Sequence, residues 1–357
     1  MAEAVVTGSV HVVGAHGLGE TLVSLLADFS RDLGISEVTF QRRAVLETDK
    51  ARLKALLDKG ALVAAEGAAK SELERLGLEV STTPRAALEK AQVVVDATAL
   101  AGTLRESYAA LKNARGVIAL QADASFGPAV AHGVNLAALR RGVDRLVRVA
   151  SAPAQGMALL TAALAGSAGS RTASAVEGRF VSLMRSSDVG AAVDLPATLV
   201  LRTPVHAECG AEDAVTAEAL LHGAGARVPI TAQAAELNQQ LMHVLTFGVT
   251  LREDVSTADA LARLAEAERV ALTEKLSPNP VFAFGRDHGY AGRMFNVAVV
   301  PRGALWVRNG REVMGAAWLP PEGSELYTAA ALVLWFLEGE AALRRLDALK
   351  PYVFKDV

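Results

Sequence analysis

A glycine-rich turn near the start of the chain has the residue types needed to hold a phosphate group. Gly14, Gly17 and Gly19 lie between a short apolar run, Val10 to Val13, and a segment with helical spacing. Glycines let the backbone approach a pyrophosphate, and the amides at a helix N-terminus carry a partial positive charge that attracts it. The pattern therefore predicts a dinucleotide-binding turn.

His16 occupies the position at which such a turn usually has its second glycine. Its imidazole could fill the space that the phosphate needs, in which case the glycines serve only the packing of a helix against a strand. The ring could instead donate a hydrogen bond to a phosphate oxygen. The sequence leaves both interpretations open.

Two consecutive arginines, Arg42 and Arg43, follow a strand expected at Val38 to Phe40. A protein selective for NAD usually has an acidic residue here to bind the ribose 2′-hydroxyl, whereas guanidinium groups suit the 2′-phosphate of NADP. We therefore expect NADP to be preferred over NAD if either cofactor binds. The alternative is that both side chains are simply solvated after a strand.

Cys209 is the one cysteine of the chain, so an intramolecular disulfide and a multi-cysteine metal site are excluded. His206 precedes it by three residues, and a cysteine beside a base could act as a nucleophile. The alternative, which we favour, is that a lone cysteine is a small apolar filler.

The histidines are scattered, and no pair has the spacing of a metal-binding helix, so we predict no metal site. His243 falls in a strand-like run and is expected to be a core histidine with satisfied hydrogen bonds. Arg286, Asp287 and His288 lie in a segment from Gly285 to Gly292 that we expect to be a surface turn, with a ligand lid as the alternative. The histidines are His11, His16, His132, His206, His222, His243 and His288.

The composition favours a folded protein of two domains over a disordered, nucleic-acid-binding or membrane protein. A chain of 357 residues favours two domains, and 51% hydrophobic against 21% charged residues argues against long disorder. A net charge of −3 provides no basic excess for nucleic acid, which we do not expect as a partner. Residues 1–6 show no secretory signal, and the apolar stretches 150–168 and 327–337 fall short of a bilayer span. We therefore expect a soluble cytoplasmic protein without a membrane partner.

Short apolar runs alternate with helical segments up to about residue 150, which predicts a Rossmann-like, doubly wound parallel sheet. Strands are expected at 10–13, 38–40, 61–65, 78–80, 93–96 and 116–120. Helices are expected at 20–33, 49–57, 68–76 and 84–90, and a further helix is expected to end within 108–113.

The pattern changes after about residue 150, where strand-like runs become longer. Asn309-Gly310 separates two of them and strongly predicts a hairpin. Strands are expected at 178–184, 197–202, 242–252, 294–300, 304–307 and 312–318. The fold class is therefore α/β, with the Rossmann-like domain over 1–150 and a second α/β domain with a mostly antiparallel sheet over 151–320. A helix within 321–357, broken near 338–340, is expected to pack back on the first domain.

Several segments resemble the archaeal-type (type II) glyceraldehyde-3-phosphate dehydrogenases. Val93 to Thr98 is similar to the family's Val-Val-Asp-Ala-Thr strand end, and Gly133 to Gly156 to the stretch that ends in its catalytic motif. Ala304 to Trp318 is similar to the family's C-terminal hairpin. The resemblance runs from about residue 10 to about residue 343. It implies that Asp96 and Thr98 line the cofactor cleft.

The same resemblance implies that the family's nucleophile is missing. Within Val147 to Gly156, Ala152 stands where the family has the cysteine that attacks the aldehyde. Pro153, Ala154 and Gln155 replace the Asn-Thr-Thr that follows. A methyl group cannot form a thiohemiacetal, so we expect no phosphorylating glyceraldehyde-3-phosphate dehydrogenase activity.

Two further residues correspond to the family's substrate site. His222 is the nearest match to its catalytic histidine, and Arg185 retains one of two arginines that hold the substrate phosphate, while Ser186 replaces the other. The polar stretch after the family's hairpin becomes apolar at Ala316 to Pro320. These changes agree with a site that no longer acts on the ancestral substrate.

Three hypotheses of function follow. The first is a glyceraldehyde-3-phosphate dehydrogenase-like protein that is inactive in that reaction, can bind nucleotide and acts in regulation, scaffolding or assembly. The second is an NADP-dependent oxidoreductase that transfers hydride without a covalent intermediate. The third is a structural protein with a vestigial cofactor cleft. The resemblance also implies a homo-oligomer, a dimer or tetramer, with candidate interface residues Leu199, Leu201, Trp306 and Val307.

Overall fold

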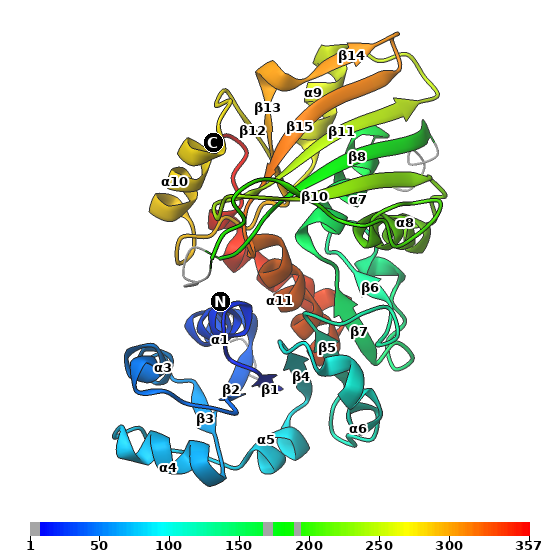
Figure 1. Cartoon of the computed structure of the whole chain (residues 1–357). Helices are drawn as coiled ribbons and strands as arrows, with labels where there is room; N and C mark the ends of the chain where they lie inside the picture. Colours follow the sequence, from blue (N-terminus) through cyan, green and yellow to red (C-terminus); the bar gives the residue numbers. More distant parts are fainter. Residues whose placement is uncertain (1–7, 167–173, 189–193) are drawn as a thin grey trace. The chain divides into compact units, whose positions relative to one another are not determined.

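The computed structural model describes residues 8–166, 174–188 and 194–357. Residues 1–6, where we expected no secretory signal, and the end of the apolar stretch 150–168 lie outside this part of the chain. The chain divides into two units (Figure 1). Unit 1 consists of Met1–Val130, Leu139–Val149 and Leu326–Ala348, and unit 2 of Ala131–Ala138, Ala150–Glu325 and Leu349–Val357.

Unit 1 contains a sheet of seven parallel strands in the order β3-β2-β1-β4-β5-β7-β6, which confirms the predicted Rossmann-like architecture. In its centre, Val13 pairs with Gln41 on one side and Asp96 on the other, so three strands end side by side. The strands are β1 (Gly8–Val13), β2 (Ile35–Gln41), β3 (Leu62–Ala64), β4 (Val93–Asp96), β5 (Gly116–Ala119), β6 (Ala129–Val130) and β7 (Leu146–Val149).

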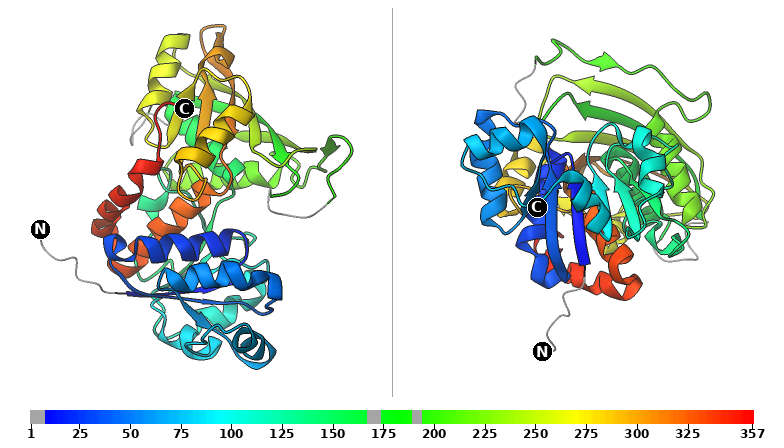
Figure 2. Two further views of the ribbon diagram at one scale, coloured as in Figure 1. Left: turned by 90° about the vertical axis from the view of Figure 1, so that its left-hand side faces the viewer. Right: turned by 90° about the horizontal axis from the view of Figure 1, so that it is seen from below.

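Helices connect these strands and cover both faces of the sheet, with α1 on one face and α5 on the other (Figures 1 and 2). Thr83 caps α5 by accepting a hydrogen bond from Ala86 N at 3.2 Å. The helices are α1 (Leu18–Asp28), α2 (Ser30–Leu33), α3 (Lys50–Asp58), α4 (Gly67–Arg75), α5 (Pro84–Lys90) and α6 (Arg105–Ala109), with short 3-10 turns at η1 (Glu47–Asp49) and η2 (Ala101–Leu104).

Two predictions for unit 1 need correction. The helix expected over 20–33 is interrupted at Phe29 and continues as the short α2. The strand expected over 78–80 is wrong, because only Thr82 forms a single bridge, to Ala64. Leu78 is buried by packing alone, so its apolar character reflects the core and not a sheet.

The long helix α11 (Gly323–Glu338) contributes its residues from 326 onward to unit 1. A Cβ placed on Gly116 would come within 2.2 Å of the Phe336 ring, so the glycine lets the helix lie directly on the sheet. The helix ends at Gly339, whose φ of +86° is the left-handed conformation common after a helix, and the expected break is confirmed. The 3-10 segment η6 (Glu340–Tyr352) follows.

Unit 2 contains a mixed sheet in the order β12-β13-β15-β11-β8-β10-β9, with β14 paired to β15. Most neighbours are antiparallel, as predicted, whereas β12–β13 and β8–β10 are parallel. The hairpin is confirmed, with positive φ at both Asn309 and Gly310. The strands are β8 (Ala175–Arg185), β9 (Val200–Leu201), β10 (Ile230–Leu237), β11 (His243–Leu251), β12 (Val270–Thr273), β13 (Ala298–Pro301), β14 (Trp306–Arg308) and β15 (Glu312–Leu319).

One face of this sheet is packed against helices. α7 (Ala152–Leu164) contacts β8 and β11 as well as the helices α8 (Glu212–Gly223) and α9 (Thr257–Glu266), which explains why it is apolar all round. α10 (Pro278–His288), η3 (Leu136–Ala138) and η5 (Arg302–Ala304) complete the unit. In the part of the chain that the structure describes, no helix has the length and apolar character to cross a membrane.

Three predictions for unit 2 are corrected. The surface turn predicted over 285–292 is wrong for its first four residues, because 285–288 form the last turn of α10. The strand expected over 197–202 is reduced to β9, whose apolar side chains are exposed at the sheet edge. The strand expected over 294–300 begins only at Ala298, because the preceding residues are buried outside the ladder.

Candidate functional site

The glycine turn of unit 1 is shaped by close contacts at the end of β4. Gly14 has a φ of +81°, and a Cβ there would come within 2.4 Å of the Thr98 methyl group. A Cβ on Gly19 would come within 2.3 Å of Gly14 O and 2.7 Å of Ala97 Cβ. These two glycines therefore allow α1 to pack tightly against the turn and the adjacent strand, as in a dinucleotide fold.

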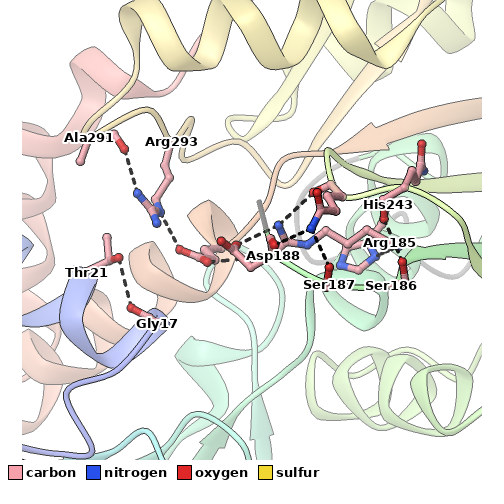
Figure 3. A network of polar contacts seen from close by, with 12 residues as sticks. Gly17, Thr21, Arg185, Ser186, Ser187, Asp188, His243, Ala291 and Arg293 are labelled. Carbon is pink, nitrogen blue, oxygen red and sulfur yellow. Dashed lines mark hydrogen bonds and ion pairs between the residues drawn. The ribbon is translucent and has the colours of Figure 1, made fainter. Parts of the chain in front are cut away.

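Gly17 differs from Gly14 and Gly19, because it is exposed to solvent instead of packed against other atoms. It is the exposed N-cap residue of α1, has a φ of +49°, and no atom lies within 4 Å of a Cβ placed on it. Its carbonyl accepts a hydrogen bond from Thr21 Oγ1 at 3.3 Å (Figure 3). The amino end of an 11-residue helix thus faces open space, where an anion would be stabilised.

Arg42 does not extend into solvent at the end of β2. It is 5% exposed, its Nη1 lies 3.1 Å from Asp49 Oδ1, and its Nε donates to His16 Nε2 at 3.3 Å. Arg42 Nη2 also contacts His16 Nδ1, and since a neutral imidazole has one acceptor nitrogen, only one of the two contacts is a hydrogen bond. Arg43 is exposed, so of the two arginines it is the one available to a 2′-phosphate.

His16 lies exposed beside the turn, with its ring against Arg42. Partial burial of the ring against Arg42 lowers the pKa of His16, the charge of Arg42 lowers it further, and Asp49 opposes both. The imidazole is therefore neutral at pH 7 and retains one N–H donor.

Asp96 is fully buried at the end of β4. Its Oδ1 accepts a hydrogen bond from Thr98 N at 2.7 Å, and its Oδ2 accepts one from Tyr108 OH at 2.6 Å. Burial, followed by the charge of Asp96, raises the pKa of Tyr108. The carboxylate thus shapes the loop after β4, and both of its oxygens are engaged by the protein itself.

In unit 2, Ala152 is the first residue of α7 and is 3% exposed. Its backbone N donates to Glu325 Oε1 at 3.0 Å. Ser151 caps the helix by accepting from Ala154 N at 3.3 Å, and its Oγ donates to Asp213 Oδ1 at 2.5 Å. The positive end of α7 therefore faces two carboxylates that the chain itself supplies.

Glu325 also accepts a hydrogen bond from Ser324 Oγ at 2.9 Å. Burial raises the pKa of Glu325, and the charge of Glu322 adds to this, while the hydrogen bonds from its own backbone, Ser324 and Ala152 act in the opposite direction. The carboxyl group occupies the position where an external anion would meet the amide of residue 152.

Arg185 ends β8 and enters a network of alternating charges (Figure 3). Its side chain is 12% exposed, with Nη1 at 3.1 Å from Asp188 Oδ2 and Nη2 at 3.8 Å from Glu322 Oε1. The other oxygen of Glu322 accepts from Arg293 Nε at 2.6 Å. Glu322 has a φ of +63°, which is strained for a residue with a side chain, so surrounding contacts hold it in place.

His243 starts β11 beside this network. Its Nδ1 accepts a hydrogen bond from Arg185 N at 3.1 Å, so the predicted satisfied histidine is confirmed. Burial, followed by the charge of Arg185, lowers the pKa of His243 to about 4. The imidazole is therefore neutral at pH 7 and fixes the backbone from which Arg185 extends.

His222 is not brought to residue 152. It is exposed in the last turn of α8, whereas Asp213, in the first turn, contacts Ser151. Nine residues of α-helix span about 14 Å. The structure thus places Arg185 and His243 together and His222 at the far end of α8.

Cys209 is 5% exposed. Burial raises the pKa of its thiol to about 11, and Glu218 and Glu208 raise it as well. The Nδ1 of His206 accepts from the backbone amide of Cys209 at 3.2 Å. A protonated, buried thiol favours the role of a filler over that of a nucleophile.

Sequence reasoning missed Asp213, Glu322, Glu325 and Arg293. Each is an ordinary polar residue in a loop or first turn, and contacts such as that of Glu325 with Ala152 join distant parts of the chain. Among the described residues, no group of three or more His, Cys, Asp or Glu side chains could hold a metal ion. Compared with known proteins, the chain matches no protein-family model and no curated protein.

Proposed function

We propose that this chain is a nucleotide-binding relative of the archaeal-type glyceraldehyde-3-phosphate dehydrogenases that has lost their acyl-transfer chemistry and acts in regulation, scaffolding or assembly. The observation that supports this most directly is the contact of Glu325 with the amide of Ala152. The nucleophile position holds a methyl group, and the neighbouring amide is occupied by a carboxylate of the chain.

Loss of the nucleophile and occupation of the helix end by carboxyl groups would both prevent covalent catalysis. Covalent catalysis on an aldehyde requires a thiolate, and its activation at a helix N-terminus depends on the partial positive charge of that end. In this chain Glu325 and Asp213 lie at that end, and Asp213 is held by Ser151. A thiol restored at residue 152 would lie beside the carboxylate of Asp213 and the buried carboxyl group of Glu325, neither of which stabilises a thiolate.

The Arg185 network is a poor phosphate site for a similar reason. Two guanidinium groups, of Arg185 and Arg293, are balanced by the carboxylates of Asp188 and Glu322 within 4 Å. A substrate phosphate would have to displace at least one of these carboxylates. Such a network holds the loop before α11 in place better than it would bind an anion.

Nucleotide binding is supported by the open amino end of α1. The turn packs through Gly14 and Gly19 as in a dinucleotide fold, and the exposed Gly17 leaves its backbone accessible to a pyrophosphate. Arg43 is exposed after β2 and suits a 2′-phosphate. We therefore propose NADP as the preferred nucleotide, with NAD as the weaker one.

We also propose that the chain self-associates through the sheet of unit 2. Apolar side chains of the strands are exposed, with Trp306 at 52% and Leu201 at 75%, and Leu199 beside β9 is 44% exposed. Val307, the fourth predicted interface residue, is partly buried. Large exposed apolar side chains of this kind favour a protein interface.

The proposal is tested by an activity assay on three proteins: the natural chain, Ala152→Cys and the matched control Ala152→Ser. Each is incubated with NADP or NAD, glyceraldehyde 3-phosphate and inorganic phosphate, and formation of the reduced nicotinamide is followed by absorbance. We expect no turnover in any of them, because the helix end carries Glu325 whatever side chain follows Ser151. Sustained turnover by the natural chain would overturn the loss of chemistry, and turnover by Ala152→Cys alone would overturn the role given to Glu325.

A further inference from the structure

The end of β2 lies directly against the glycine turn. The backbone amides of Gly14 and Ala15 both donate to Gln41 O at 3.2 Å. In a dinucleotide fold the turn holds the pyrophosphate, and the residues that end the second strand meet the 2′ position of the adenosine ribose. Arg42 follows Gln41, the last residue of β2, so it lies where a 2′-hydroxyl is distinguished from a 2′-phosphate.

The charge of Arg42 is neutralised at this position by Asp49. Arg42 Nη1 lies 3.1 Å from Asp49 Oδ1, and the two side chains are only 3% and 16% exposed. Because both charges are mostly withdrawn from water, their attraction is screened less than that of a surface pair. The region beside the turn therefore contains a guanidinium–carboxylate pair without net charge.

Asp49 is held in this place by the turn to which it belongs. Its Oδ2 accepts a hydrogen bond from Leu46 N at 2.9 Å, and its own backbone N donates to Leu46 O at 2.9 Å. These two bonds stabilise η1, which leads directly into α3. With one oxygen toward Leu46 and the other toward Arg42, the carboxylate cannot turn away from the guanidinium without losing the hydrogen bond that caps its turn.

Asp49 provides the only carboxylate that forms an ion pair with Arg42 in the part of the chain that the structure describes. On its other side, Arg42 Nε donates to Nε2 of His16 at 3.3 Å, and that imidazole is neutral at pH 7. Arg43, the next residue, is exposed. The charge of Asp49 therefore acts on Arg42, and Arg43 is left to attract an anion.

We propose that Asp49 is a specificity-determining residue, which limits the preference for NADP over NAD by cancelling the charge with which Arg42 would attract a 2′-phosphate. A phosphate beside this pair is attracted by Arg42 and repelled by Asp49, so the net attraction comes from Arg43. The 2′-hydroxyl of NAD has no charge, so the same pair affects NAD little. The inference rests on the proposed nucleotide binding and names the residue that limits its selectivity.

The test is a calorimetric titration of the full chain with NADP and with NAD. Asp49→Asn removes the charge, and its amide oxygen can still accept the hydrogen bond from Leu46 N. Asp49→Ser is a second neutral variant whose hydroxyl can accept the same bond. Glu47→Gln is the matched control, because it removes one negative charge from the same η1, where Glu47 lies 3.8 Å from Arg75 and not beside Arg42. The double variant Arg42→Gln, Asp49→Asn removes both charges of the pair, and circular dichroism establishes that each variant is folded.

We expect both neutral variants of Asp49 to bind NADP at least about fivefold more tightly than the natural chain, because the charge that opposes Arg42 is gone. NAD binding by these variants, and binding of both nucleotides by Glu47→Gln, should change by less than about twofold. The double variant should show no gain for NADP, because the gain depends on the charge of Arg42.

Two results would overturn the inference and leave the proposed function intact. One is an unchanged ratio of NADP to NAD affinity in both neutral variants of Asp49, and the other is a gain for NADP that the double variant retains. If the natural chain and all variants bind neither nucleotide, the proposed function fails, and the inference about Asp49 fails with it.

Discussion

His243 makes the stability of unit 2 depend on pH in a way that can be calculated from the structure. Its Nδ1 accepts a hydrogen bond from Arg185 N at 3.1 Å, so protonation of this nitrogen breaks the bond. Burial and the charge of Arg185 lower the pKa from 6.5 to about 4 in the folded chain. In the unfolded chain the histidine binds a proton near pH 6.5. Between these values the unfolded state holds more protons, so the free energy of unfolding falls as pH falls.

The size of the effect follows from the difference in pKa. One pKa unit corresponds to about 1.4 kcal/mol, so the full difference contributes about 3 kcal/mol to the free energy of unfolding. About 2 kcal/mol of this contribution is lost between pH 7 and pH 5. Because the residue is only partly buried, solvent makes this figure an upper bound.

His243→Asn isolates this contribution, because the amide oxygen of Asn can accept the same hydrogen bond from Arg185 and does not titrate. Urea denaturation of both proteins at pH 7 and pH 5 gives the loss of stability on acidification. We expect the natural chain to lose about 2 kcal/mol more than the variant. Equal losses in the two proteins would show that the histidine is not held neutral by burial, and the reasoning would fail.

Three further predictions concern other residues. Gly19→Ala should destabilise unit 1 by about 1–3 kcal/mol in urea denaturation, because its Cβ would collide with the turn. Gly102→Ala is the matched control and should cost less, because the nearest atom to its Cβ beyond its neighbours in the chain would be Asp123 Oδ2, at 3.9 Å, and its φ is not in the left-handed region. The reverse order would contradict the packing described. Cys209 should react slowly with a thiol reagent at pH 8 in the folded chain and fast in urea, because burial raises its pKa to about 11. Arg43→Ala should weaken NADP binding more than NAD binding in calorimetry, whereas Arg42→Ala should mainly lower stability, because Arg42 is buried against Asp49.

The sequence was sufficient to predict the parallel sheet of unit 1. Val93 to Val95 is a short apolar run, and such a run between helical segments has few alternatives to a buried strand. Asn309-Gly310 likewise fixed the hairpin, since both residues tolerate positive φ. Strand positions were predicted wrongly where an apolar residue is buried without pairing in the sheet, as Leu78 is.

The candidate site was predicted less completely. The turn glycines were predicted from their spacing. The burial of Arg42 was not, because it depends on an ion pair with Asp49, which lies in η1 and belongs to no motif. The carboxylate at Ala152 comes from Glu325, and their separation along the chain of 173 residues gives no local pattern. Long-range pairs of this kind are fixed by the packing of whole elements, which residue types and spacing alone do not determine.

The central claim is that the glycine turn still binds a nucleotide although the nucleophile is gone. It is tested most directly by calorimetric titration of the purified chain with NADP and with NAD. We predict saturable binding of one nucleotide per chain, tighter for NADP than for NAD. The absence of saturable binding for both nucleotides would contradict the claim and would assign the turn around Gly14 and Gly19 to packing alone.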